Sequence, residues 1–262
     1  IVSAIFRRNS VFFRPYGAMW RQALETFDTL FVQNVESKRL LSEIGFDNVV
    51  VAGDTRFDRV AQIAAAAQRV ETIERFRGGG RLFVAGSTWG PDEEILLPLV
   101  NANPDVKFVI APHEMDEGRI AHLMRDAKGG AVRYTQCDAA TRFDDVQVLV
   151  LDTMGMLSSV YGSATWAYVG GGFGVGIHNT LEAATFGLPI AFGPNYGKFK
   201  EARDMVSLGC AVSVRTAGEL AAWFAPLRDD EETLRRASRT AKDYTARNQG
   251  ATGIILRSIF NS

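Results

Sequence analysis

Short apolar segments alternate with segments of helical length through almost the whole chain, and this alternation limits it to few folds. Nearly continuous apolar strands separated by helices are typical of a parallel sheet that helices cover on both faces. We therefore predict an α/β fold with a doubly wound, Rossmann-like parallel sheet. The expected strands are Thr29–Val32, Val49–Ala52, Leu82–Ala85, Phe108–Ala111, Val132–Thr135, Val148–Leu151, Trp166–Val169, Pro189–Phe192 and Ala211–Val214.

One domain boundary is visible. Asp54–Arg77 has the apolar period of one long helix, and the three glycines that follow, Gly78 to Gly80, are a strong helix stop. Only two strand-helix units precede this helix, whereas most of the strands follow it. We therefore predict that residues 1–77 are the end of one domain and that 78–262 form a complete second domain. One or two closing helices are expected from about Glu231 onward.

Composition and charge exclude several classes of protein. A formal net charge of −1 argues against a nucleic-acid binder, and no apolar run reaches the roughly 18 residues that cross a bilayer. Cys137 and Cys210 lie far apart without metal-ligand spacing, which predicts reduced intracellular thiols. Because the chain opens on an apolar, strand-like Ile1–Phe6 without an initiating Met, we expect a soluble fragment of a longer protein.

The first 24 residues form a basic and aromatic segment, with no acidic residue before Glu25. Such a surface suits anionic lipid headgroups. The alternative is an ordinary amphipathic helix with solvated arginines, which the residues alone favour. The basic residues are Arg7, Arg8, Arg14 and Arg21, and the aromatic residues are Phe6, Phe12, Phe13, Tyr16 and Trp20.

A glycine-rich segment, Gly170–Gly176, lies between an expected strand and an expected helix. Glycines at such a junction let backbone N–H groups approach an anion closely, and Gly172 is a candidate contact. A dinucleotide site would also need an acidic residue about 20 positions further on. The next strand instead ends in Gly193-Pro194-Asn195, so an NAD-dependent oxidoreductase is disfavoured.

Polar residues follow several other expected strands. Ser87 and Thr88 lie at one strand-to-helix turn, where either can cap the helix or bind phosphate, and His113 follows another strand after Pro112. Since ligands of open α/β sheets collect at the carboxyl ends of the strands, these residues and the glycine segment are expected to converge. A further turn, which contains Gly155 and Met156, offers main chain to a flat base, and Asp152 or Thr153 can cap the helix that follows.

Glu182 is the candidate acid of this site. It stands four residues after His178, which predicts one helical turn and the same helix face. Such a carboxylate can accept hydrogen bonds from ribose hydroxyls, or it can be a solvent-facing residue that favours the helix dipole; spacing leaves both open. The sequence has no Cys/His cluster, no Asp-x-Asp pair and no Gly-x-Ser-x-Gly turn, so neither a metal, a cofactor nor a nucleophilic serine is predicted.

Taken together, these motifs resemble the bacterial 3-deoxy-D-manno-octulosonic acid (Kdo) transferases of lipopolysaccharide biosynthesis. The resemblance covers nearly the whole chain. It rests on Phe12–Gly17, Gly53–Asp58, Ser87-Thr88, Ala111–His113, Asp152–Gly155, Gly170-Gly171, His178-Asn179 with Glu182, and Gly187 to Pro194, which occur in this order at suitable separations.

The resemblance implies a GT-B fold, in which two Rossmann-like domains face each other, and metal-independent transfer with inversion. The reaction would carry Kdo from CMP-Kdo to a lipid A precursor at the cytoplasmic face of the bacterial inner membrane. Ser87 and Thr88 would lie near the phosphate, and His113, with Pro112, Gly155 and Met156, near the cytosine. Gly172, His178, Asn179 and Glu182 would complete the donor site on the phosphate and ribose side.

Three residues depart from the family pattern: Trp89 replaces a basic residue, Met156 a glutamate and Ala183 a proline. In the family the general base, a glutamate, lies in the N-terminal domain with much of the acceptor site and the membrane-associating region. The resemblance therefore implies that this chain binds CMP or CMP-Kdo weakly and transfers nothing alone. The alternatives are a transferase or epimerase of the same fold that uses a UDP-sugar, and a non-enzymatic nucleotide-binding module.

Overall fold

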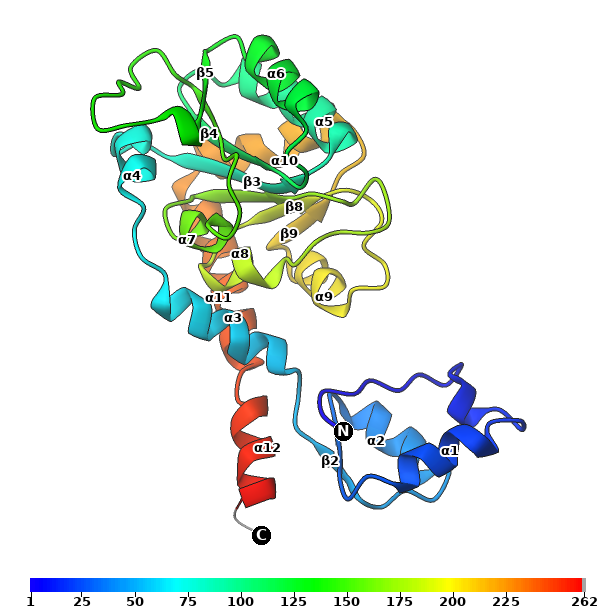
Figure 1. The fold of residues 1–262 in the computed structure, drawn as a ribbon. Helices are drawn as coiled ribbons and strands as arrows, with labels where there is room; N and C mark the ends of the chain where they lie inside the picture. Colours follow the sequence, from blue (N-terminus) through cyan, green and yellow to red (C-terminus); the bar gives the residue numbers. More distant parts are fainter. Residues whose placement is uncertain (261–262) are drawn as a thin grey trace. The chain divides into compact units, whose positions relative to one another are not determined.

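The computed structural model describes residues 1–260 of the chain, which divide into two compact units (Figure 1). The first unit comprises Ile1–Gln62 together with the chain from Ala246 onward, and the second comprises Ile63–Thr245. These units differ from the predicted ranges at the boundary and in the last helix, which belongs to the first unit. The division into an acceptor part, 1–77, and a donor domain, 78–262, stays a prediction.

A sheet of seven parallel strands forms the centre of the second unit, in the order β5-β6-β4-β3-β7-β8-β9. All nine expected strands are present, two of them in the first unit, so the α/β prediction is confirmed. The strands of the large sheet are β3 (Leu82–Thr88), β4 (Lys107–Pro112), β5 (Ala131–Arg133), β6 (Val148–Val150), β7 (Trp166–Val169), β8 (Ile190–Phe192) and β9 (Ala211–Ser213).

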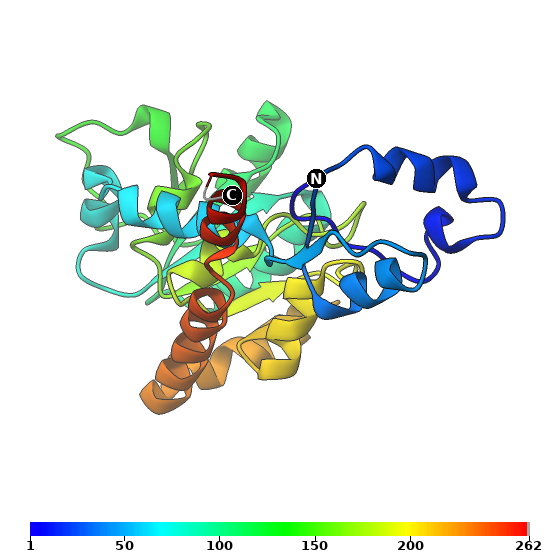
Figure 2. The ribbon, with the colours of Figure 1, turned by 90° about the horizontal axis from the view of Figure 1, so that it is seen from below.

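Helices cover both faces of this sheet, as the doubly wound prediction requires (Figure 1, Figure 2). Alternate residues of β3 belong to opposite cores: Leu82 and Val84 to one, Phe83 and Ala85 to the other. One face packs against α4 (Glu71–Arg77), α7 (Leu157–Tyr161), α8 (Leu181–Thr185) and α9 (Lys200–Leu208), the other against α5 (Gly90–Ala102), α6 (Glu117–Asp126) and α10 (Ala217–Asp229), while α11 (Glu231–Arg247) contributes to both.

The strand order places a topological switch point between β3 and β7. From β3 the chain moves to β4 on one side, and from β7 it moves to β8 on the other. Because all seven strands are parallel, the loops that follow them lie at one edge of the sheet. A switch point at that edge is where open α/β sheets bind ligands.

The long helix predicted over Asp54–Arg77 is wrong in one respect. The structure has two helices, α3 (Thr55–Ala66) and α4, with four non-helical residues between them. Val70 has extended backbone angles, and the new helix after it buries Ile73 and Phe76 in the core of the second unit. The burial of these two side chains stabilises the chain more than one continuous helix would. The predicted stop is confirmed, since Gly78 ends α4 with φ of +59°.

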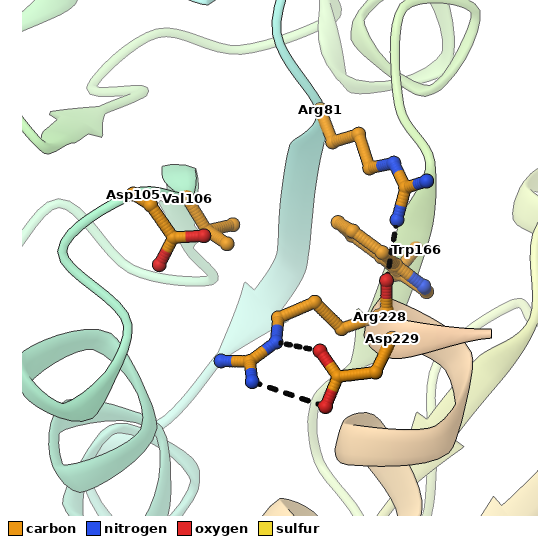
Figure 3. Close-up of a pocket in the computed structure, with 6 residues that line it drawn as sticks. All are labelled: Arg81, Asp105, Val106, Trp166, Arg228 and Asp229. Carbon is orange, nitrogen blue, oxygen red and sulfur yellow. Dashed lines mark hydrogen bonds and ion pairs between the residues drawn. The ribbon is translucent and has the colours of Figure 1, made fainter. Parts of the chain in front are cut away.

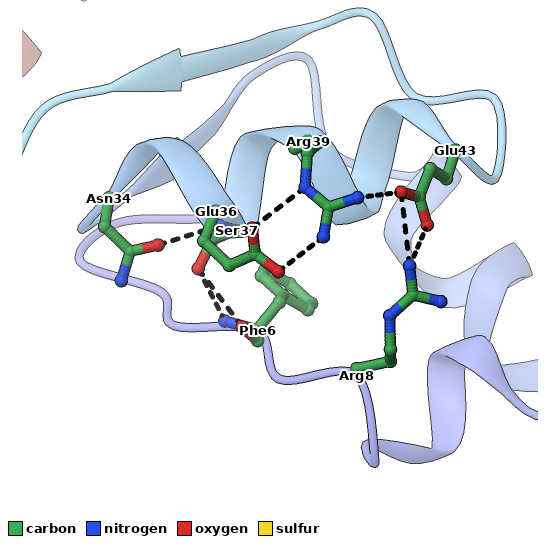
Figure 4. A network of polar contacts seen from close by, with 7 residues as sticks. All are labelled: Phe6, Arg8, Asn34, Glu36, Ser37, Arg39 and Glu43. Atoms are coloured by element: carbon green, nitrogen blue, oxygen red, sulfur yellow. Dashed lines mark hydrogen bonds and ion pairs between the residues drawn. The ribbon is translucent and has the colours of Figure 1, made fainter.

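The first unit contains two parallel strands, β1 (Leu30–Val32) and β2 (Val49–Val51), and a polar network around one helix. The Asn34 side chain caps α2 (Val35–Ser42) by accepting from the Ser37 N–H at 2.7 Å (Figure 4). Arg39 pairs with Glu36 and Glu43 on the exposed face. The other elements of the first unit are η1 (Val11–Phe13), α1 (Ala18–Glu25), α2, the start of α3, and α12 (Ala251–Phe260). In the second unit, the short helix η2 (Tyr134–Gln136) follows β5. Where one or two closing helices are predicted from about Glu231 onward, the structure has α11 and α12.

Part of the basic segment at the start of the chain has structural partners. Arg8 pairs with Glu43 at 3.1 Å, and Arg21 donates to the carbonyl oxygens of Phe12 and Arg14. Tyr16, Met19 and Trp20 are 75%, 69% and 47% exposed. Lipid contact by this segment stays a prediction. Within residues 1–260, no helix combines the length and apolarity that a membrane span needs.

Candidate functional site

The corner after β3 holds Ser87 and Thr88 in different environments. Ser87 has φ of +54°, and its hydroxyl has no hydrogen-bond partner among residues 1–260. Thr88 is fully buried, and its hydroxyl donates to Glu93 at 2.9 Å; Glu93 in turn pairs with Arg119 at 2.6 Å. Neither residue caps the helix, because Trp89 is the residue before α5. Ser87 therefore offers the free hydroxyl of this corner.

Asp92 ties two corners together and is the residue whose role sequence reasoning missed. The sequence marks it only as an acid in the first turn of a helix. Its carboxylate is fully buried and accepts from the Tyr168 hydroxyl at 2.7 Å and from the backbone N–H groups of Trp89 and Gly171, each at 2.9 Å. Burial, and next the Asp92 charge, raise the pKa of Tyr168. The corner after β3 is thereby joined to the glycine loop after β7.

The glycine loop after β7 fits between its neighbours because it lacks side chains. A Cβ on Gly170 would lie 2.1 Å from the carbonyl oxygen of Ser87, and one on Gly172 would lie 2.6 Å from the backbone of Gly193. The Gly172 carbonyl also accepts from the Asn195 N–H at 2.8 Å. Backbone therefore approaches backbone on both sides of the loop, as the glycine pattern predicts.

Three aromatic rings from three different corners form a cluster at this edge. The Trp89 and His113 ring centroids lie 4.8 Å apart, those of His113 and His178 lie 4.4 Å apart, and Trp89 Nε1 lies 3.3 Å from His178 Nε2. Burial, followed by the proximity of His113, lowers the pKa of His178, and Asp92 opposes this change. His178 is consequently neutral near pH 7, with Trp89 donating to its Nε2.

Glu182 occupies the start of α8, but its predicted relation to His178 is wrong. Helix α8 begins at Leu181, so His178 lies in the loop and shares no helix face with Glu182. Glu182 instead accepts from the Ser158 hydroxyl at 2.7 Å and from the Asn179 amide at 3.0 Å. Thr180, at the N-cap position of α8, is buried and its side chain makes no capping hydrogen bond. Glu182 thus connects α8 with α7.

The corner after β6 presents Gly155 and Met156 before α7. Gly155 is exposed with φ of +83°, and a Cβ there would meet no atom within 4 Å. Met156 is half-buried against the core and precedes α7, which has no side-chain cap. The proposed capping role of Asp152 is wrong, because its carboxylate accepts from Arg133 at 2.7 Å and from the Thr135 N–H at 2.9 Å.

Contacts connect the predicted site residues of all these corners. Pro112 ends β4, and the following His113 N–H donates to the Thr88 carbonyl at 2.9 Å. The hydroxyl of Tyr161 and the side chain of Leu157, both on α7, leave no room for a Cβ at Gly86 in β3. The residues that lie at this common edge are Ser87, Thr88, Pro112, His113, Gly155, Met156, Gly172, His178, Asn179 and Glu182.

A pocket of about 390 Å³ lies at the opposite, amino-terminal edge of the sheet (Figure 3). Arg81 lines it and donates to the Arg228 carbonyl at 2.6 Å, while Arg228 pairs with Asp229 at 2.7 Å. Trp166 and Asp105 complete the wall with Val106. These guanidinium groups are bound within the protein, and none of the predicted site residues lines this pocket. Across residues 1–260, no three His, Cys, Asp or Glu side chains gather as metal ligands would.

Comparison of the sequence with known proteins identifies relatives over the whole chain, although no family model matches it. The chain is 26% identical over 269 aligned positions to the Kdo transferase of Bordetella pertussis, covering 99% of this chain and 62% of the relative. A Rickettsia felis Kdo transferase is 23% identical over 75% of this chain and 43% of its own length. The chain is thus similar in sequence to Kdo transferases over nearly its whole length. It spans less than two thirds of the length of these relatives.

Solved structures show that the chain shares the fold of GT-B glycosyltransferases. The C-terminal CMP-Kdo binding domain of WaaA from Acinetobacter baumannii matches 70% of the chain, and 98% of its own, with a TM-score of 0.54 and 20% identity. A UDP-N-acetylglucosamine 2-epimerase matches 99% of the chain, and 65% of its own, with a TM-score of 0.64 and 12% identity. The predicted fold class and the resemblance to the Kdo transferases are both confirmed.

Proposed function

We propose that the second unit binds CMP-Kdo and is the donor half of an enzyme that transfers Kdo to a lipid A precursor. The observation that supports this most is the convergence of Ser87, His113, His178 and Glu182 from the three corners after β3, β4 and β7 at the switch point. Homology to the Kdo transferases supports the choice of donor. The complete enzyme would act at the cytoplasmic face of the inner membrane.

The geometry gives each group a role. The free Ser87 hydroxyl and the N–H of Gly172 would contact the phosphate, because the N–H groups of the other loop glycines, Gly170, Gly171, Gly174 and Gly176, already donate within the protein. The exposed main chain at Gly155 would take the cytosine, beside His113. The carboxylate of Glu182, held by Ser158 and Asn179, would accept from the ribose hydroxyls. The Thr88 hydroxyl would support the site through its hydrogen bond to Glu93.

In the proposed reaction, a deprotonated acceptor hydroxyl attacks Kdo with inversion while CMP leaves, without a metal. The donor half would stabilise the charge that develops on the leaving phosphate. The general base, worth about 10²–10⁴-fold, is assigned to no residue of this chain. Since the chain spans 62% of its B. pertussis relative, we propose that it binds the donor but does not complete transfer alone.

Calorimetric titration of the 262-residue chain with CMP-Kdo tests this function. Replacing Glu182 by Gln should weaken binding by about tenfold, because hydrogen bonds to a charged group are worth about 1.5–3 kcal/mol. Glu71→Gln, at an exposed position on α4, is the matched control and should leave affinity unchanged. The same samples supplied with a lipid A precursor should yield no Kdo-bearing product. Equal binding by the Glu182 variant would contradict the assigned role, and formation of product would contradict the donor-half assignment.

A second candidate is a UDP-sugar enzyme of the same fold. The match to the UDP-N-acetylglucosamine 2-epimerase covers nearly the whole chain and favours it. Its 12% identity supports the fold alone, whereas the sequence relatives are Kdo transferases. The two candidates differ in the nucleotide that they bind.

A further inference from the structure

The strand order gives the proposed donor a direction across the sheet edge. The corners that would take the cytosine follow β6 and β4, and those that would take the phosphate follow β3 and β7. The next strand in the same direction is β8. The loop from Gly193 to Phe199, which connects β8 to α9, therefore lies where the sugar would extend beyond the phosphate.

The sugar of this donor is an acid, so it brings a carboxylate in addition to the phosphodiester. A carboxylate that leaves water needs a cation or several hydrogen-bond donors. The five loops of the site, 88–89, 113–116, 151–156, 170–180 and 193–199, contain one lysine and no arginine. That lysine is Lys198, in the loop after β8.

Lys198 is positioned against the glycine loop and carries no acidic partner in the described chain. Its Nζ donates to the carbonyl oxygen of Val175 at 2.8 Å, and it lies 3.2 Å from where a Cβ on Gly176 would stand. The side chain is exposed and passes over the Phe199 ring at 5.3 Å. One of the three ammonium donors is used on a neutral acceptor, so two remain for an anion.

Three neighbouring cations are already paired with carboxylates. Lys200, two residues further on, pairs with Asp204. Arg119 pairs with buried Glu93, and Arg133 pairs with Asp152 and Glu117. Trp89 stands in the corner after β3 and brings no charge.

We propose that Lys198 binds the carboxylate of the donor's acidic sugar and so distinguishes CMP-Kdo from CMP. This inference rests on the proposed function and assigns a specificity residue within that site. Lys198 forms a charge-assisted hydrogen bond to the carboxylate while its contact with Val175 holds the side chain in place.

Titration of the 262-residue chain with CMP and with CMP-Kdo tests the inference. The unaltered chain should bind CMP-Kdo about tenfold more tightly than CMP, and Lys198→Gln should remove that difference while changing CMP affinity less than twofold. Lys198→Arg should keep most of the difference. Lys200→Gln is the matched control, since its partner is Asp204, and should leave both affinities unchanged.

The outcomes separate this inference from the proposed function. If the unaltered chain binds CMP-Kdo and Lys198→Gln keeps the preference over CMP, the inference is wrong and the function stands. If Lys198→Gln weakens the binding of CMP and of CMP-Kdo equally, Lys198 acts at the phosphate and the inference is wrong. The inference is also wrong if the unaltered chain binds CMP-Kdo no more tightly than CMP. If the unaltered chain binds neither ligand, the proposed function fails and the inference fails with it. Unfolding midpoints of all variants should agree, because both lysines are exposed.

Discussion

At the scale of single residues, one buried carboxylate organises the candidate site. Asp92 receives three hydrogen bonds, and two of their donors are backbone N–H groups of different corners. A buried charge that is fully hydrogen-bonded is stable, but it becomes costly when a partner is lost or reversed. The arrangement of Trp89 and of the glycine loop therefore depends on this residue.

Replacing Asp92 by Asn should lower the free energy of unfolding by about 2 kcal/mol or more, because an amide NH₂ would face backbone N–H donors. Urea denaturation measures the change. Tyr168→Phe, which removes one of the three bonds, should cost about 1 kcal/mol, and Glu94→Gln, an exposed change on the same helix, should cost almost nothing. A loss for Asp92→Asn no larger than that for Glu94→Gln would refute this account.

His178 should make stability depend on pH. Its pKa in the folded chain is lowered from 6.5, first by burial and then by His113, so the unfolded chain binds a proton that the folded chain does not. Stability should therefore fall as the pH drops below about 6.5, by at most about 1.4 kcal/mol per pH unit from this residue. Denaturation at pH 7.5 and 5.5 should show a smaller acid loss in His178→Gln than in the unaltered chain. An equal or larger loss in the variant would be inconsistent with this explanation.

Single residues also show where sequence reasoning stops. Ser87, His113 and Glu182 could be placed at the carboxyl ends of strands because strand ends are visible in the sequence. The role of Asp92 could not, because an acid in a first helical turn is common and its partner Tyr168 is 76 residues away. The sequence does not show the hydrogen bond from Thr88 to Glu93 either, although the two residues are only five positions apart.

At the scale of elements, the glycine loop is the part of the site most sensitive to added volume. Gly172→Ala would place a Cβ 2.6 Å from the backbone of Gly193, which cannot rotate away as a side chain can. We expect a loss of about 1–3 kcal/mol in the free energy of unfolding. Gly174→Ala in the same loop meets its nearest atom at 3.8 Å and should change stability by less than about 0.5 kcal/mol. Equal effects of the two substitutions in thermal or urea unfolding would show that the close approach is absent.

Elements were predictable where their signal is local. The apolar strands are local in the sequence, so all nine were found within a few residues of their observed bounds. Helix lengths were less predictable: α3 and α4 read as one helix because the apolar period continues across Ala67–Val70. The four-residue spacing from His178 to Glu182 predicts a shared helix, although α8 starts at Leu181. For α4, which buries Ile73 and Phe76, the apolar period does not report where the helix starts.

At the scale of the whole molecule, parallel strands predicted one functional edge, but their order could not be read from the sequence. The order β6-β4-β3-β7-β8 depends on which strands pair across long separations. It is the strand order that turns scattered corner residues into a site with a base end and a sugar end. The division into compact units likewise depends on the last helix, α12, which belongs with the first residues of the chain.

The central claim, that this site binds a cytidine nucleotide, is tested most directly by thermal unfolding of the 262-residue chain with CMP, UMP or UDP at equal concentrations. A ligand that binds only the folded state stabilises it by RT ln(1 + [L]/Kd), about 2.7 kcal/mol at a hundredfold excess over Kd. We predict that CMP raises the unfolding temperature more than UMP or UDP does. A larger rise with UDP, or no rise with CMP, would contradict the account.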